Sequence, residues 1–423
     1  DLNSNSITGT GNLDIANGTI KLDGDYPTGT GNVAMGNASL DSGSLSGNFN
    51  TAIGSTSLTD NTSGASNVGV GYGSLANNTT GGSNTAMGVN SLEANQTGSN
   101  NVALGTQALD ANTGSNNTAV GYQSLVLNTS GTYNTAVGTL ALDANQTTNS
   151  NTAIGYAALG VNVASNNTAV GTSALDANTS GATNVAVGVA ALGANTTASN
   201  NTAVGASALA VNTTGTQNTA VGANALDANI EADNNTAVGY NSLTLSTTGA
   251  NNASVGAFSL AANTQGSHNN AFGTAAMAKN TTGDNNVAIG CGALCTNTTA
   301  DNNTAVGTSS LKVNTASNNT AVGFSSLTAN TTGTTNTAIG NYSLYSNTEG
   351  NDNMAFGYNA LGLNLTGDNN VAMGRDALLN NTTASNNTAV GKNALRANTT
   401  GHSNTAVGYN VLASAVTGNE NTG

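Results

Sequence analysis

The sequence is poor in charge. Only 6% of its 423 residues are charged, with 6 Lys and Arg against 20 Asp and Glu, so the formal net charge is −14. A protein that binds nucleic acid or an anionic membrane presents a basic patch or stripe. We therefore expect neither nucleic acid nor an anionic membrane surface as a partner.

Long hydrophobic runs are also missing. A helix that crosses a bilayer needs about 20 consecutive apolar residues, and no such run occurs in this chain. A secretory leader is not evident at the start either. We therefore expect no membrane span in this chain.

Cysteine and histidine are scarce, with two residues of each. Cys291 and Cys295 lie four residues apart, too far to bridge along an extended strand, so a disulfide would require a turn between them. Two cysteines do not indicate the redox compartment. His268 and His402 lie in the turn segment before the repeated motif and have no recurrent acid or nucleophile partner, so we interpret them as exposed turn residues.

Motifs for catalysis or for phosphate binding are missing too. Catalysis needs a few unlike residues that converge in a pocket, whereas this chain places like residues in rows. The glycine motifs are not followed by the Lys-Ser or Lys-Thr of a phosphate loop. We expect a non-catalytic protein with no catalytic residues, no cofactor and no metal.

What the chain does contain is a repeat. A five-residue motif, most often Asn-Thr-Ala-Val-Gly, recurs in 23 copies at intervals of 16 to 18 residues, and its closing glycine (the motif glycine) runs from Gly36 to Gly408. So constant a period is typical of a solenoid, in which each repeat buries its apolar face by stacking on its neighbours. The repeat therefore predicts one elongated body and overrules the two or three domains that the length alone suggests.

Seventeen residues are too few for the two helices of a helical repeat. They suit two short strands and two turns, so we predict an all-β fold, a parallel β-solenoid (β-roll) of about 23 coils. One strand is the motif itself, with Thr and Val on one face and Ala and Gly on the other, and the small face is suited to close approach by another layer. The second strand is expected at the Ala-Leu pair, as at Ala108 and Leu109.

Two asparagine columns appear when the repeats are aligned on the motif glycine. The first column lies four residues before it in every copy, and the second lies seven residues after it in 20 copies. Stacking would place such side chains about 4.8 Å apart, so each amide could donate to the next in a ladder. The alternative is that asparagine simply suits turns. The predicted structural ladder comprises Asn101, Asn117, Asn134, Asn151, Asn167, Asn184 and Asn201.

Large apolar residues stand just before the motif glycine, and Leu stands four residues after it in 22 copies. We predict that both columns form the core. The predicted core residues are Leu109, Leu125, Leu142, Leu159, Val120, Val137 and Ile154.

Two other columns have a candidate surface chemistry. Asp110, Asp143 and Asp176 occupy one column in every second coil. A calcium row is conceivable because carboxylates are calcium ligands, but the aspartate nonapeptide of calcium-binding rolls is absent, so we interpret these acids as solvated surface charge.

The residue after the motif glycine is often aromatic, as at Tyr122 and Tyr358. Exposed, such rings could stack on sugars; we interpret them as filler at a strand end.

The two ends differ from the repeat. We expect residues 1–31 to be an N-terminal capping or docking segment, 32–412 to be the solenoid, and 413–423 to be an end without an evident cap. Asn17-Gly18 between two short apolar runs is a hairpin signal. Within this segment we identify a candidate assembly segment of Leu13, Ile15, Ile20, Leu22 and Tyr26.

The motifs at 32–36, 101–105 and 286–290 read NVAMG, NVALG and NVAIG. They resemble the NSVAIG core of the YadA-like head repeat of trimeric autotransporter adhesins, and the resemblance covers residues 32–408. It implies a left-handed parallel β-roll with two strands per coil and three chains packed side by side in an extracellular adhesive head. The small Ala and Gly face is compatible with such packing. Related repeats occur in surface-fibre proteins.

Together these features predict a non-catalytic structural or adhesive fibre protein, extracellular or on the cell surface. Its expected partner is itself, in a head-to-tail filament, a homotrimer or both, with surface glycans or host cell surfaces as further candidates. The alternative is an ice-binding solenoid that presents rows of Thr. Thermal hysteresis would separate the two, because a plain fibre should show none.

Overall fold

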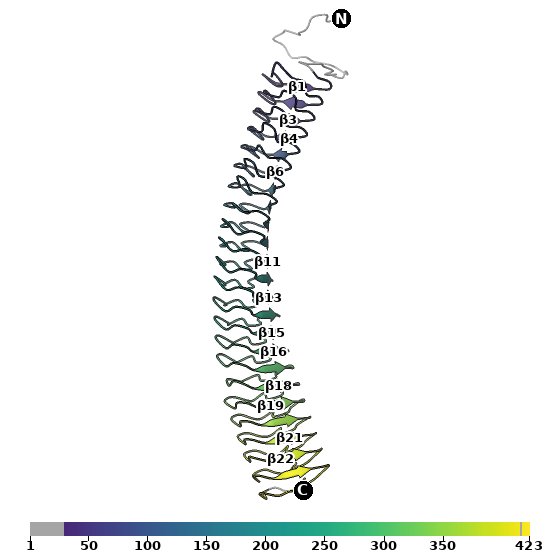
Figure 1. Ribbon diagram of the computed structural model, residues 1–423, viewed down its shortest axis with the longest axis vertical. Helices are drawn as coiled ribbons and strands as arrows, with labels where there is room; N and C mark the ends of the chain where they lie inside the picture. Colours follow the sequence, from purple (N-terminus) through teal and green to yellow (C-terminus); the bar gives the residue numbers. More distant parts are fainter. Residues whose placement is uncertain (1–28, 415–416) are drawn as a thin grey trace, which may run out of the picture.

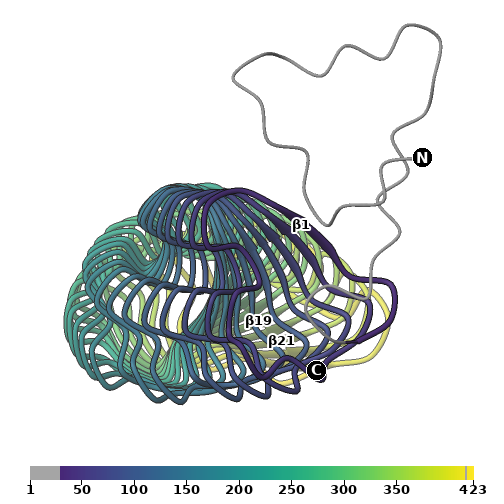
Figure 2. The same ribbon diagram turned by 90° about the horizontal axis from the view of Figure 1, so that it is seen from above.

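The computed structural model describes residues 29–414 and 417–423. These residues form a stack of coils that makes a long, gently curved rod (Figure 1). Viewed down the rod, the coils lie over one another with a progressive shift (Figure 2). The predicted all-β solenoid is confirmed, and at about 4.8 Å per coil the 23 coils extend for roughly 110 Å.

Each repeat contributes one strand, made of the three residues before the motif glycine. The strands are β1 (Val33–Met35), β2 (Thr51–Ile53), β3 (Val68–Val70), β4 (Thr85–Met87), β5 (Val102–Leu104), β6 (Thr118–Val120), β7 (Thr135–Val137), β8 (Thr152–Ile154), β9 (Thr168–Val170), β10 (Val185–Val187), β11 (Thr202–Val204), β12 (Thr219–Val221), β13 (Thr236–Val238), β14 (Ala253–Val255), β15 (Asn270–Phe272), β16 (Val287–Ile289), β17 (Thr304–Val306), β18 (Thr320–Val322), β19 (Thr337–Ile339), β20 (Met354–Phe356), β21 (Val371–Met373), β22 (Thr388–Val390) and β23 (Thr405–Val407).

Each strand from β2 to β22 pairs in parallel with the strands of the coils before and after it, and β1 and β23 each pair with one neighbouring strand. The register places equivalent positions of successive repeats opposite one another. Between β6 and β7, for example, Ala119 lies opposite Ala136. The repeat thus becomes a set of straight columns along the rod.

The expected second strand does not form. The Ala-Leu segment is a turn, because Gln107 and Leu109 both have left-handed backbone, with φ of 58° and 53°. Left-handed backbone at alternate residues keeps this segment from being an extended strand. Coil-to-coil hydrogen bonds persist there, as from Leu109 N to Ser124 O at 3.1 Å, so the stack is held on this side without a strand.

The motif glycine is required by both backbone and space. Its φ lies between 131° and 142° in every coil, a region open only to glycine. A Cβ at Gly138 would lie 2.4 Å from the carbonyl oxygen of Gly155 in the next coil. Any larger residue would therefore push two coils apart.

The core is a narrow double row of small and large side chains. The central strand residue points inward, so Ala119 and its equivalents from β2 onward are fully buried, and they pack beside the Leu column that contains Leu125. The Ala column is therefore inside the coil and not on a face open to another layer, which corrects the sequence-based expectation. The first and third strand residues point outward.

The stack extends past the expected boundary at residue 412. Asn421 N donates to Asn404 Oδ1 at 2.9 Å, and Thr405 pairs in parallel with Thr422. At the other end, Thr30 N donates to Asn48 Oδ1 at 2.8 Å. The candidate assembly segment of Leu13, Ile15, Ile20, Leu22 and Tyr26 lies outside the described residues.

Candidate functional surfaces

All seven predicted ladder asparagines are fully buried. Their geometry differs from the expected chain of amide-to-amide bonds. Asn101 Oδ1 accepts a hydrogen bond from the backbone N–H of Asn117 at 2.9 Å, and Asn101 Nδ2 donates to the carbonyl of Gly114 at 2.9 Å. Each side chain therefore ties the backbone of one coil to that of the next and satisfies groups that water cannot reach.

The second asparagine column makes the direct ladder. Asn78 Nδ2 donates to Asn61 Oδ1 at 2.7 Å, and Asn95 Nδ2 donates to Asn78 Oδ1 at 2.8 Å. The same amide nitrogens also donate to a carbonyl three residues later, as from Asn78 to Gly81 at 3.0 Å. Ser246 interrupts this column, and Asn229 Oδ1 is left buried with no hydrogen-bond partner among the described residues.

The predicted core is partly wrong. Leu109, Leu125, Leu142 and Leu159 are fully buried. Val120, Val137 and Ile154, however, are the outward third residues of their strands and are only half-buried, with Ile154 40% exposed. The alternation of a strand separates two faces but does not say which one is inside, and here the smaller residue, Ala, takes the interior.

The outward strand residues form a surface that we call the sheet face. Its first column is mostly Thr and its third is Val, Ile, Met, Leu or Phe. The third column stays partly accessible along the rod, from Met35 at 53% exposed to Val204 at 37% and Val407 at 60%. An apolar stripe thus follows the sheet over its whole length.

The side chains one, two, five and six positions after each motif glycine form a second surface, the turn face, while those three and four positions after it, such as Ala108 and Leu109, are buried. Its acid column is less solvated than expected, because Asp110, Asp143 and Asp176 are all half-buried. Desolvation, with Glu93 adding repulsion, raises the pKa of Asp110 to about 6. Desolvation also raises the pKa of Asp143 and of Asp176. The described residues contain no group of three metal-ligating side chains.

The aromatic row on the turn face is exposed, so its interpretation as buried filler is wrong. Tyr72 is 58% exposed, Phe324 45% and Tyr409 68%. Cys291 and Cys295 lie on the same face as free cysteines.

Charge on the turn face is separated along the rod, and the separation is visible in the sequence only when charged residues are placed by their position relative to the motif glycine. Acids occupy the first twelve coils, and the later coils carry all the described cations and one acid, Asp376. The acids are Asp41, Asp60, Glu93, Asp110, Asp143, Asp176 and Asp227, and the cations are Lys279, Lys312, Arg375, Lys392 and Arg396.

The comparisons with known proteins do not extend this description: no family model matches the chain, and no curated protein is significantly similar to it. Residues 29–414 and 417–423 contain no helix that could span a bilayer.

Proposed function

We propose that this chain is a non-catalytic structural or adhesive component of an extracellular fibre. The observation that supports the proposal is the unbroken stack of 23 coils with like residues in register. Such a stack provides length and repeated surfaces, whereas catalysis needs unlike groups gathered in one place. The resemblance to the YadA-like head repeat agrees with an adhesive, extracellular role.

Side-by-side assembly is one route to the fibre. The Ala column is buried within each coil, so a second or third copy would pack on the sheet face instead. Its apolar stripe is continuous, and extended apolar patches on a soluble surface mark interaction sites. A homotrimer would bury this stripe from every copy.

Head-to-tail joining through residues 1–31 is the other route. A solenoid pairs each coil with the next through backbone hydrogen bonds, so a segment that adds to a terminal coil extends the same ladder. Deleting residues 1–31 should then leave soluble rods. Fibres that persist unchanged after this deletion would reject the head-to-tail route.

Light scattering behind a sizing column tests the proposal on the full chain. A threefold mass supports the trimer, a broad and concentration-dependent distribution supports the filament, and one species near 41.1 kDa rejects both.

Val204→Lys should weaken lateral assembly, because Val204 lies on the apolar stripe. Val211→Lys is the matched control: Val211 is 44% exposed on the turn face, at the position that Lys279 occupies in its own coil.

Ice binding is the second candidate, favoured by the outward Thr column of the sheet face. Thr118, Thr135, Thr152 and Thr168 stand in four consecutive coils before Val185 interrupts the row. Such a row on a regular sheet could order water. Thermal hysteresis that disappears in Thr135→Tyr would support ice binding, and its absence in the unmodified protein would exclude it.

A further inference from the structure

A cluster of aromatic rings occupies the turn face near the C-terminal part of the rod. Tyr342 makes edge-to-face contacts with Phe324, Tyr345 and Tyr358, with ring centroids 5.4, 5.6 and 6.1 Å apart. Phe324, Tyr345 and Tyr358 are 45%, 41% and 45% exposed. The contacts hold the rings in place, so the cluster presents a preformed apolar platform.

A hollow opens beside this platform. It has a volume of about 160 Å³ and is lined by Tyr342, Tyr345, Asn359, Gly362, Leu363 and Leu379. Tyr345, Gly362 and Leu379 occupy the same position in three successive coils, so the missing side chain of Gly362 makes the gap. A Cβ at Gly362 would lie 3.0 Å from Leu379 Cδ1.

Two cations lie on the turn face nearby, Arg375 in the coil of Leu379 and Lys392 in the next coil. The Arg375 guanidinium lies 5.5 Å from the Tyr358 ring centroid and its Nε lies 3.3 Å from Asp376, while its side chain remains 63% exposed. Lys392 follows at the same position one coil later, 5.8 Å from the Tyr409 ring.

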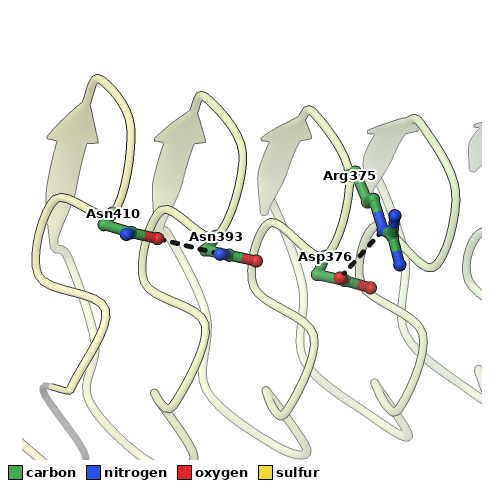
Figure 3. A network of polar contacts seen from close by, with 4 residues as sticks. All are labelled: Arg375, Asp376, Asn393 and Asn410. Carbon is green, nitrogen blue, oxygen red and sulfur yellow. Dashed lines mark hydrogen bonds and ion pairs between the residues drawn. The ribbon is translucent and has the colours of Figure 1, made fainter.

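Side-chain amides lie on the turn face beside these cations. Asn393 Nδ2 donates to Asn410 Oδ1 at 2.8 Å, in line with Asp376 (Figure 3). Asn359 holds the equivalent position in the coil before Asp376 and lines the hollow. Hydrogen-bonding groups, cations and rings therefore lie together on one strip of the turn face.

We propose that this strip, from Phe324 to Tyr409, binds an acidic polysaccharide. A sugar ring has apolar C–H faces that pack on aromatic rings, and a hollow beside the platform suits one such ring. Carboxylates along the polysaccharide would face Arg375 and Lys392, whose charge is unusual in a chain of net charge −14. The inference rests on the proposed adhesive role and names its ligand class.

A second copy of this chain is the competing occupant, because its acidic half of the turn face also complements these cations. The hollow favours the polysaccharide. Contacts between surface charges alone are weak and need no cavity, whereas the hollow and its exposed rings provide a shaped apolar site for a small cyclic group.

Calorimetric titration of the full chain with a galacturonic acid hexamer tests the proposal, with a neutral galactose hexamer as the comparison ligand. We expect the acidic hexamer to bind, and to bind more weakly as salt rises. Gly362→Leu should fill the hollow and weaken binding about tenfold or more. Gly193→Leu is the matched control, because Gly193 has the same position in its coil, far from the rings, and should bind as the unmodified protein does.

Arg375→Gln combined with Lys392→Gln should reduce both the affinity and its salt dependence. The proposal is overturned if the acidic hexamer does not bind, if both hexamers bind equally, or if Gly362→Leu binds unchanged. It is also overturned if the paired Gln substitutions lower the mass of the assembly while sugar binding is absent, since a second copy would then be the occupant. Assembly mass measured without sugar reports on the fibre proposal separately.

Discussion

At the scale of single residues, the coil depends on backbone conformations that are rarely adopted. Each repeat holds non-glycine residues in the left-handed region, such as Gln107, Leu109 and Asn116 with φ of 58°, 53° and 62°. Each costs about 1 kcal/mol or more. The chain tolerates this cost at the Leu column because the left-handed turn delivers a large side chain to the core.

The motif glycine cannot be replaced at the same cost. In Gly188→Ala we expect a loss of about 2 kcal/mol or more, because φ is 139° and the new Cβ would lie 2.4 Å from the Gly205 carbonyl oxygen. Hydrogen exchange should show faster opening of the coils that contain Gly188 and Gly205. Gly193→Ala in the same coil is the control, since the nearest atom to its Cβ, Ala190 O, is 3.2 Å away; equal protection in both variants would contradict this account.

The gap in the second asparagine column predicts a stabilising substitution. In Ser246→Asn, the new amide should donate to the unpaired Asn229 Oδ1 and accept from Asn263 Nδ2, as its neighbours in the column do. We expect a gain of about 1 kcal/mol, measured from the urea midpoint. Ser246→Ala leaves the gap open and should show no gain. Equal midpoints for the two variants would show that the ladder does not stabilise the fold.

At the scale of elements, the columns couple neighbouring coils, and the acid column does so unfavourably. Asp110 is half-buried, and Glu93 stands at the same position one coil earlier. Burial and this repulsion raise its pKa from 3.8 to about 6. At a pH between these two values, Asp110 is therefore more protonated in the folded state than in the unfolded state.

This shift predicts the direction of the pH dependence. Between about pH 6 and pH 4 the folded state holds more protons, so stability should rise as pH falls through this window and level off near the ordinary pKa of 3.8. Solvent screening limits the gain to about 1 kcal/mol at this half-exposed site. Asp110→Asn should be more stable at pH 7 and show a smaller rise. Asp60→Asn, at an exposed position, should keep the full rise in urea unfolding; a pH profile unchanged in Asp110→Asn would refute the assignment.

At the scale of the whole molecule, the stability of the rod is additive over its coils. Each coil contacts only its neighbours through the same columns, so stability is close to a sum of coil and interface terms. Among residues 29–414 and 417–423, each strand contacts only the strands of adjacent coils along the curved rod (Figure 1). Removing one coil should therefore not disturb the rest.

Deleting residues 206–222, one full repeat, should join the coil of Gly205 to the coil of Ala223 in register and keep the β-solenoid. Far-UV circular dichroism per residue and the urea midpoint should stay close to those of the parent. Deleting 206–213 removes half a coil and should open the stack locally, with a loss of hydrogen-exchange protection around that point. If both deletions behaved alike, register would not be what holds the rod together.

The period in the sequence was enough to predict the stack, the number of coils and the buried Leu column. Residues such as Leu125 and Asn117 recur at one interval, and only stacking gives every copy the same partner. The exposed rings and the hollow beside Tyr345 were not predictable in this way. They depend on neighbours one coil away, and on how far the turn carries each side chain from the strand.

The sequence by itself determined that the chain is a parallel solenoid, because side chains that recur at a constant interval can be buried only against their own copies. The tertiary structure alone decided which side faces inward. Alternation in a strand defines two faces, and both Ala119 and Val120 are apolar, so pattern does not choose between them. The narrow coil admits the smaller side chain, and Val120 and Ile154 therefore lie on the surface, where they are available to a partner.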